Sequence, residues 1–147
     1  MFDVLRHLGL LKSNDCAFYT ACVCLILEHL HDRNIIYRDL KPENIMVDSD
    51  GFPKLIDFGT AKIVERRTYT IVGTPHYMAP EIILGRGYGV QADYWSLGIM
   101  LFEFICGGVP FGEGETDPYN IYERVLERNI KWPRFVDKTE PTKNIID

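Results

Sequence analysis

The first long pattern of apolar positions predicts a helix from Ser13 to about His31. Its apolar residues recur near helical spacing, at Phe18, Cys22, Leu25 and Leu30. Ser13 suits the N-cap, and Asp15 in the first turn is favoured by the helix dipole. Because residues 21–27 are apolar almost all round, we expect this helix to be buried. A shorter pattern over the first ten residues predicts part of another helix.

Short alternating segments and turn residues follow this helix. Residues 34–47 alternate apolar pairs with charges, which indicates a loop flanked by short strands. The turn signal at residues 48–51 precedes a short apolar segment at 54–56, so we expect a small β-hairpin. Residues 57–81 contain several glycines and prolines and are typical of a loop.

Two further helices are predicted in the second half of the chain. Residues 91–106 form a nearly continuous apolar segment that ends at Gly107 and Gly108. Residues 118–128 have an amphipathic pattern, with one apolar face made by Ile121, Val125 and Leu126. Several helices and one hairpin together predict a mainly α fold of the α+β class.

Composition narrows the possible functions. The chain has 147 residues, 46% of them apolar, which is enough for one domain with a core. Its 21 acidic and 16 basic residues give a net charge of −5, which argues against a nucleic-acid surface and is compatible with basic substrates. The four cysteines lack the spacing of a metal site, and we expect buried thiols. Without a signal peptide or a spanning segment, we expect a cytoplasmic protein that neither crosses a membrane nor binds nucleic acid.

Four polar residues in two short segments indicate phosphoryl-transfer chemistry. This reaction needs a carboxylate near the attacking hydroxyl, a positive charge near the transferred phosphate, and metal ligands. Asp39, Lys41 and Asn44 supply these three types of group within six positions. Asp57 lies across the predicted hairpin, which would bring it back beside Asn44. Carboxylate and amide oxygens suit Mg²⁺.

Three motifs in a fixed order resemble those of the eukaryotic protein kinases. They are Tyr37-Arg38-Asp39-Leu40 with Asn44, Asp57-Phe58-Gly59, and Ala79-Pro80-Glu81. The tyrosine at position 37 and the segment 67–75 resemble the AGC group, and within it the segments 73–81 and 92–99 resemble most closely the cyclic-GMP-dependent kinases. The resemblance covers residues 1 to about 133. It implies a kinase-like C-terminal lobe, helical with a small β-hairpin at the catalytic cleft.

The resemblance implies a role for each residue of the central motifs. Asp39 would accept or orient the proton of a substrate Ser or Thr hydroxyl, and Lys41 would lie beside the γ-phosphate of ATP. Asn44 and Asp57 would hold Mg²⁺. Met46 would form the floor beneath adenine, a role compatible with an ordinary core methionine.

The segment that follows the Asp-Phe-Gly motif would carry regulation. Thr70 resembles the activation phosphosite, and its phosphate would pair with Arg38. A single loop threonine is usually just exposed, but the flanking Thr-Tyr-Thr and two arginines favour the phosphosite. Thr74 resembles the threonine that bonds to the catalytic Asp and Lys and favours substrates with a hydroxyl group.

Two acidic residues would select protein substrates with Ser or Thr near basic residues. Glu43 and Glu103 resemble positions that receive a substrate arginine, although an exposed glutamate is more often simply solvated. Glu103 interrupts an apolar helix, which favours the functional interpretation. His76 stands where the best-known members carry another glutamate, so the preference for basic residues would be weaker or shifted.

Other residues are predicted to be structural. Phe58 and Gly59 complete the Asp-Phe-Gly motif. Asp93, at the start of a buried helix, would accept N–H bonds from the backbone of the catalytic loop. Glu81 would normally pair with an arginine that this chain lacks, at a cost of roughly 3–5 kcal/mol if it stays charged and buried. The histidines are expected to be core or surface residues.

The resemblance also implies what lies outside the chain. Residues 1–147 would be a partial kinase domain, running from just after the hinge to about the helix G region, with the N-terminal lobe absent. A cyclic-nucleotide-binding regulatory domain would lie elsewhere in the protein. We expect the chain alone to bind ATP poorly and to be inactive. The alternative is a truncated, non-catalytic binding module.

Overall fold

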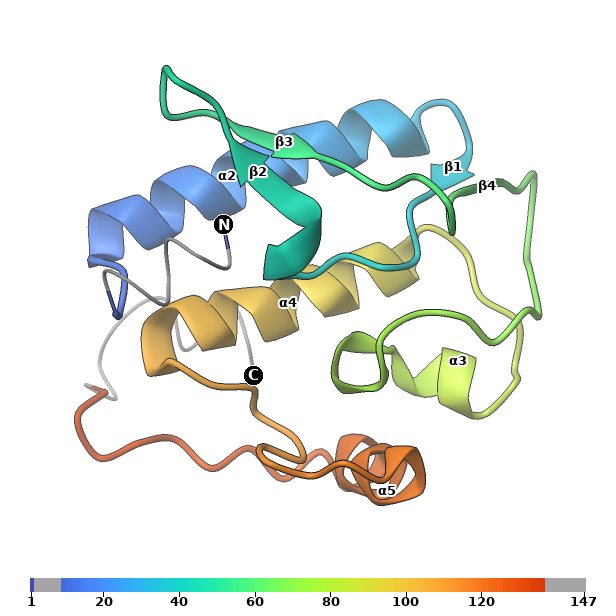
Figure 1. Ribbon diagram of the computed structural model, residues 1–147. Helices are drawn as coiled ribbons and strands as arrows, with labels where there is room; N and C mark the ends of the chain where they lie inside the picture. Colours follow the sequence, from blue (N-terminus) through green and yellow to red (C-terminus); the bar gives the residue numbers. More distant parts are fainter. Residues whose placement is uncertain (2–8, 137–147) are drawn as a thin grey trace.

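The fold is mainly helical, as the sequence predicts (Figure 1). This computed structural model describes Met1 and residues 9–136. Its elements in chain order are α2 (Ser13–His31), β1 (Ile35–Ile36), the 3₁₀ turn η1 (Pro42–Asn44), β2 (Ile45–Val47), β3 (Pro53–Leu55), β4 (Lys62–Ile63), the 3₁₀ turn η2 (Pro75–Tyr77), α3 (Pro80–Ile83), α4 (Gln91–Cys106) and α5 (Pro118–Glu127). The helix predicted over the first ten residues lies largely outside the described residues.

Helix α2 has the predicted length but a different buried face. It packs against α4 and buries Cys16, Val23, Leu27 and Leu30. Phe18 and Leu25 are 42% and 65% exposed, so the predicted core face is wrong at both positions. The nearly uniform apolar composition of the helix hides which side faces α4. The N-cap position belongs to Lys12, which makes no side-chain cap bond, so the prediction for Ser13 is also wrong.

The predicted hairpin is confirmed, and a second strand pair joins it. Strands β2 and β3 pair antiparallel, with Met46 opposite Lys54. In the turn, Asp48 Oδ1 accepts the backbone N–H of Asp50 at 3.0 Å and that of Phe52 at 2.9 Å. Strands β1 and β4 also pair antiparallel. The expectation of loop throughout residues 57–81 is therefore wrong at β4, whose pairing partner β1 lies far away in the sequence, and at η2 and the start of α3, which are single helical turns too short to show a period.

Helix α4 runs through the centre of the molecule, with the hairpin on one side and α5 on the other (Figure 1). Its predicted bounds are confirmed, and Gly107 ends it in the left-handed conformation at φ 83°. It buries residues on most of its circumference, among them Leu97, Met100, Leu101 and Phe104. This continuous burial explains why its apolar pattern showed no polar face.

The last helix and the cysteines correct two smaller expectations. On α5, Ile121 and Val125 are buried as predicted, but Leu126 is 40% exposed. Cys16 is buried whereas Cys24 is exposed, so the cysteines are not all buried thiols. Over the residues that the structure describes, none of the helices has both the length and the apolar character needed to cross a bilayer.

Candidate active site

The backbone of the catalytic loop, residues 37–44, is fixed by a buried carboxylate from α4. Asp93, 1% exposed, accepts the backbone N–H of Tyr37 at 2.9 Å and that of Arg38 at 2.8 Å. His31 Nε2 lies 2.8 Å from the same carboxylate. These bonds hold Arg38 at φ 73°, a left-handed conformation that a non-glycine residue rarely adopts. The two N–H bonds are those expected of Asp93 from the sequence.

Four polar side chains meet beside this loop. The Thr74 hydroxyl donates to Asp39 Oδ1 at 2.6 Å, and Lys41 Nζ donates to the Thr74 oxygen at 2.7 Å. Lys41 Nζ also lies 3.0 Å from Asp39 Oδ2. The Asn44 amide nitrogen donates to the same Oδ2 at 3.0 Å. Thr74 is 35 residues from Asp39 in sequence, so the fold brings two separate motifs together.

A glycine allows the two segments to approach this closely. Gly73 has φ 124°, and a Cβ on it would lie 2.7 Å from the carbonyl oxygen of Arg38. That separation is shorter than real Cβ contacts, and the obstructing atom is backbone rather than a movable side chain. Any larger residue at position 73 would therefore push Thr74 away from Asp39.

The oxygens of Asn44 and Asp57 fit a magnesium ion. Both bonds of Asn44 use its amide nitrogen, to the carbonyl and the carboxylate of Asp39, which leaves the amide oxygen as an available acceptor. Asp57 is exposed, at φ 58°, and its Oδ1 accepts the backbone N–H of Gly59 at 3.1 Å, while its Oδ2 accepts no hydrogen bond from the described residues. Mg²⁺ is commonly held by one or two such side chains together with phosphates and waters. No larger cluster of His, Cys, Asp and Glu ligands occurs among the described residues.

Two apolar side chains near these polar groups are open to solvent. Met46 on β2 and Phe58 are 57% and 49% exposed. The Phe58 ring packs edge-on against Tyr37, with 5.4 Å between ring centroids. Tyr37 itself is fully buried, and its hydroxyl bonds to the carbonyl of Ile56 at the end of the hairpin. Burial, and next the negative charge of Asp39, raise the pKa of Tyr37.

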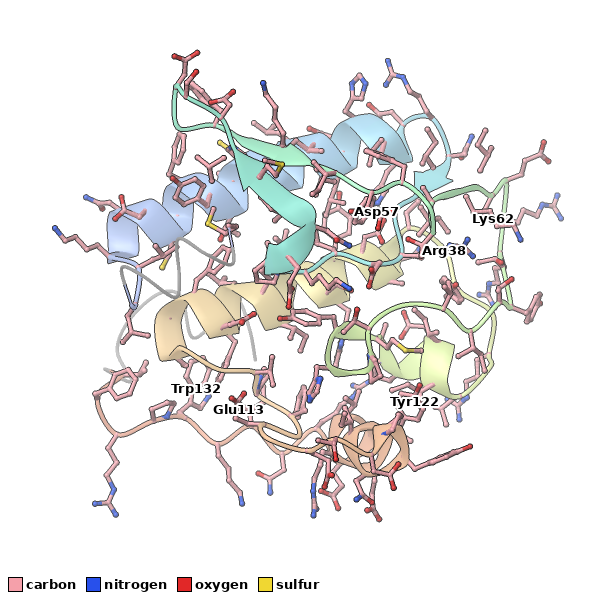
Figure 2. The ribbon with its side chains drawn as sticks, viewed as in Figure 1. Arg38, Asp57, Lys62, Glu113, Tyr122 and Trp132 are labelled. Carbon is pink, nitrogen blue, oxygen red and sulfur yellow. The ribbon has the colours of Figure 1, made fainter. Side chains whose placement is uncertain are left out.

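The predicted phosphosite, Thr70, and the arginine expected to pair with its phosphate, Arg38, both have polar neighbours. The guanidinium of Arg38 bonds through Nε to the carbonyl of Thr60, while its NH1 is buried and has no hydrogen-bond partner among the residues that the structure describes. Thr70 is exposed, and its hydroxyl lies 3.5 Å from that of Thr68. Lys62 Nζ donates to Thr68 at 3.2 Å. Figure 2 shows Arg38, Asp57 and Lys62 on three neighbouring segments.

The two predicted substrate-binding glutamates differ in exposure. Glu43 is exposed, whereas Glu103 on α4 is half-buried and accepts the Tyr77 hydroxyl at 2.6 Å. Burial raises the pKa of Glu103 above its usual value, and the nearby charges of Glu43 and Glu113 raise it further, against the lowering effect of the Tyr77 bond. The geometry therefore joins Glu103 to η2, close to Thr74.

Glu81 is half-buried rather than buried, and makes no ion pair among the described residues. It lines a cavity of about 720 Å³ together with Trp95 and Phe111, whose rings stack 6.1 Å apart, and Arg128, whose guanidinium lies over Trp95. This cavity does not include the residues around Asp39. The site is therefore defined by converging hydrogen bonds and not by the cavity.

The sequence did not indicate several residues of this region. Lys62 stands in a segment without motif or period, and only the β1–β4 pairing places it near Thr68. The sequence also gave no sign of the roles of Tyr77 and Tyr88. The Tyr77 hydroxyl donates to Glu103 and the Tyr88 hydroxyl donates to the carbonyl of Thr70, and both bonds depend on tertiary packing. His31 was expected to be a core or surface residue, and its side chain is 8% exposed.

Comparison with known proteins shows which family has this sequence. The family model for the protein kinase domain matches residues 1–147. The chain is 50% identical over 140 residues to the cGMP-dependent protein kinase of Plasmodium berghei (strain Anka). The aligned region covers 95% of the chain and 16% of that protein. It is 52% identical over 136 residues to the cGMP-dependent protein kinase of Toxoplasma gondii, covering 92% of the chain and 14% of that protein.

A cyclic-AMP-dependent relative is also similar. The chain is 45% identical over 137 residues to the human cAMP-dependent protein kinase catalytic subunit PRKX, covering 93% of the chain and 38% of that protein. The chain thus spans less than half of each of these relatives. It belongs to the protein kinase family, in the AGC group with the cyclic-nucleotide-dependent kinases. The resemblance drawn from its motifs is confirmed.

Proposed function

We propose that the protein containing this chain is a Ser/Thr kinase that transfers the γ-phosphate of ATP to Ser or Thr of protein substrates. One observation carries the proposal. A hydroxyl group of the chain itself, on Thr74, donates to Asp39 at 2.6 Å and accepts from Lys41 at 2.7 Å. A substrate hydroxyl at the same carboxylate would find a base for its proton and a cation for the phosphate it attacks.

The neighbouring residues support this proposal through their chemistry. Asn44 and Asp57 would hold Mg²⁺, which would neutralise charge on the phosphates of ATP. Lys41 would lie beside the γ-phosphate, and Met46 would lie beneath adenine. Residues 1–147 would form part of the kinase domain. Because Met46 and Phe58 are largely exposed here, we expect the chain alone to bind ATP weakly and to transfer no measurable phosphate.

Substrate choice and regulation follow from the acidic and basic groups around the site. Glu43 and the half-buried Glu103 would pair with basic residues near the target Ser or Thr. Phosphorylation of Thr70 would add a dianion that could pair with Arg38, whose NH1 lacks a hydrogen-bond partner within the described part of the chain. The relatives named for cGMP and cAMP dependence support regulation by a cyclic-nucleotide-binding domain outside this chain.

The test uses the full-length protein with ATP labelled at the γ-phosphate. We expect Mg²⁺-dependent transfer to a peptide with Ser flanked by arginines, much less transfer when Ser is replaced by Tyr, and stimulation by a cyclic nucleotide. Transfer without cyclic-nucleotide stimulation would contradict only the regulation. Absence of transfer to any Ser or Thr peptide, under conditions in which ATP binds, would contradict the kinase function and favour a non-catalytic binding module.

A further inference from the structure

A pocket of about 340 Å³ lies where the activation segment, residues 57–74, meets the connection between α3 and α4. Thr68 and Tyr88 pair as an isolated antiparallel bridge with two backbone bonds of 2.9 Å, which sets the two stretches side by side. Figure 1 shows the activation segment running from β4 towards α3, beside this connection. The pocket therefore depends on the fold, since its two walls are separate in the sequence.

Three arginines line this pocket. Arg66 and Arg67 come from the activation segment, and Arg86 comes from the connection between α3 and α4. All three are exposed, and none of them makes an ion pair with another described residue. Glu81 is the one acidic residue among the described residues that line the pocket, and it also lines the larger cavity that contains Arg128. The pocket thus has an excess of positive charge without a counter-charge of its own.

Two glycines allow the walls of the pocket to lie close together. A Cβ on Gly87, which has φ 72°, would lie 2.6 Å from the ring of Tyr69. A Cβ on Gly89 would lie 2.9 Å from Oε1 of Gln91. Both separations are shorter than real Cβ contacts, so glycine lets these side chains lie directly against the backbone. Gln91, the first residue of α4, also lines the pocket, and its amide adds a neutral donor to the three guanidinium groups.

The pocket is separate from the predicted phosphosite. The Thr70 hydroxyl lies 3.5 Å from that of Thr68, which accepts a bond from Lys62 at 3.2 Å. Neither Thr70 nor Lys62 lines the pocket, and Arg38, the arginine expected to pair with a phosphate on Thr70, does not line it either. A group bound in the pocket would therefore use different arginines from those expected for the activation phosphate.

We propose that this pocket is a binding site for a phosphate monoester. Guanidinium groups bind phosphate oxygens through paired, charge-assisted hydrogen bonds, and three of them on two segments can surround one such group. A phosphate monoester brings about two negative charges and three strong acceptor oxygens, whereas a carboxylate brings one charge and two oxygens. The phosphate can be carried by a residue of another protein or by a small molecule. The inference goes beyond the proposed function, because binding here uses none of the residues assigned to phosphoryl transfer.

The experiment measures binding to the full-length protein without ATP, by fluorescence anisotropy. The probes are three labelled peptides of otherwise neutral residues, which carry phosphoserine, Glu or Ser at one position. Arg66→Gln/Arg67→Gln and Arg86→Gln remove charge from each wall of the pocket. Arg86→Lys keeps the charge but removes the planar fork of the guanidinium. Lys131→Gln/Arg134→Gln removes two exposed positive charges elsewhere and is the control.

We expect the wild type to bind the phosphoserine peptide at least about tenfold more tightly than the Glu peptide, because of its additional charge and acceptor oxygens. Arg86→Gln should weaken binding by about threefold to tenfold, and Arg66→Gln/Arg67→Gln by about tenfold or more. Arg86→Lys should lose less than Arg86→Gln, and the control should stay within about twofold of the wild type. Binding should strengthen between about pH 5 and 7, because the phosphate loses its second proton near pH 6.

Two results would overturn the inference. One is equal affinity for the phosphoserine and Glu peptides, and the other is unchanged affinity in both arginine-to-glutamine variants. Competition with free O-phosphoserine separates the sources of the phosphate. Displacement at concentrations similar to those of the unlabelled peptide supports a small phosphorylated molecule, and much weaker displacement supports a phosphorylated protein segment. Phosphoryl transfer is measured separately with labelled ATP, so a failure of the proposed function would leave the binding result unchanged.

Discussion

The catalytic loop and the activation segment, residues 37–44 and 57–74, differ in how the fold holds them. In the catalytic loop, Tyr37 and Leu40 are fully buried and Asn44 is 7% exposed. Bonds reach the loop from α4, from the end of the hairpin and from Thr74. The residues of this loop that the proposed chemistry uses are Asp39, Lys41 and Asn44, and each makes at least one hydrogen bond or ion pair.

The activation segment is attached at a few points, with exposed side chains between them. Strand β4 pairs with β1, and Thr68 pairs with Tyr88 through two backbone bonds of 2.9 Å. Between these points and Thr74, Tyr69 and Ile71 are 68% and 60% exposed. The comparison indicates that the proposed chemistry depends on the catalytic loop, whose geometry is fixed by buried contacts. The exposed activation segment is the part that a modifying enzyme or a substrate can reach.

The largest effect is expected at the centre of the rigid loop. Asp39→Asn keeps the size of the side chain but removes the base, and we expect the transfer rate of the full-length protein to fall by about 10²–10⁴-fold. A rapid-quench assay with labelled ATP measures this rate. Asp50→Asn, in the exposed turn of the hairpin, serves as the control. A loss of less than tenfold would show that Asp39 is not the base.

The next effect concerns the buried support of the loop. Asp93→Asn replaces one acceptor oxygen with a donor, which leaves one backbone N–H of the loop without its bond. We expect the free energy of unfolding to fall by about 2–3 kcal/mol, the contribution typical of hydrogen bonds to a charged group. Urea unfolding followed by circular dichroism measures it. If stability were unchanged, the loop would be held by other contacts than those of Asp93.

The contact between the two regions can be removed by one substitution. Thr74→Val keeps the shape but deletes the hydroxyl that joins Asp39 and Lys41. We expect kcat to fall by about tenfold or somewhat more, as for the loss of one charge-assisted hydrogen bond. Thr116→Val, on the exposed α4–α5 connection, should change kcat less than twofold. An equal kcat in both variants would show that the bond does not contribute to transfer.

Phosphorylation should order the exposed activation segment, so that it becomes more like the catalytic loop. We expect phosphatase treatment to lower the transfer rate of the wild-type protein by about tenfold, since a phosphate at Thr70 can form one to three charge-assisted bonds. Thr70→Val should not respond to the same treatment. Phosphopeptide mass spectrometry identifies the site. A response that persists in Thr70→Val would assign the regulatory phosphate to another residue.

The smallest effect is a pH dependence of stability. The raised pKa of Glu103 means that its folded state holds the proton more tightly than the unfolded state does. The stability from this difference is fully present below the unfolded pKa and is lost as pH rises through the folded one. Glu103→Gln should therefore gain stability relative to wild type at neutral pH, by about 0.5 kcal/mol or less, and should gain nothing at acid pH. Urea unfolding at both pH values tests the sign.

The sequence was most informative where function and local structure coincide in a short segment. The hairpin is marked by the residues of its turn. Helix α4 ends at Gly107, a residue type that adopts the left-handed conformation without steric strain. The residues of the catalytic loop stand within six positions, so spacing alone brought Asp39, Lys41 and Asn44 together. In the structure Lys41 and Asn44 both contact the carboxylate of Asp39.

Features that depend on tertiary packing were not predictable. The buried face of α2 is set by its contact with α4, and its apolar composition is nearly the same on both sides. Lys62 stands on a strand whose partner, β1, lies far back in the sequence, and Tyr88 reaches Thr70 beside the isolated bridge between Thr68 and Tyr88. Elements this short carry no period from which a strand could be recognised.

The close approach at Gly73 has a consequence for mutational tolerance. Tyr69 and Ile71 are exposed, so a library that randomises positions 69, 71 and 73 and selects for phosphotransfer should accept many residue types at 69 and 71. At position 73, the space available ends 2.7 Å from a carbonyl oxygen of the catalytic loop, and the backbone is left-handed. Surviving clones should therefore carry glycine at this position, even though its side chain takes no part in the chemistry.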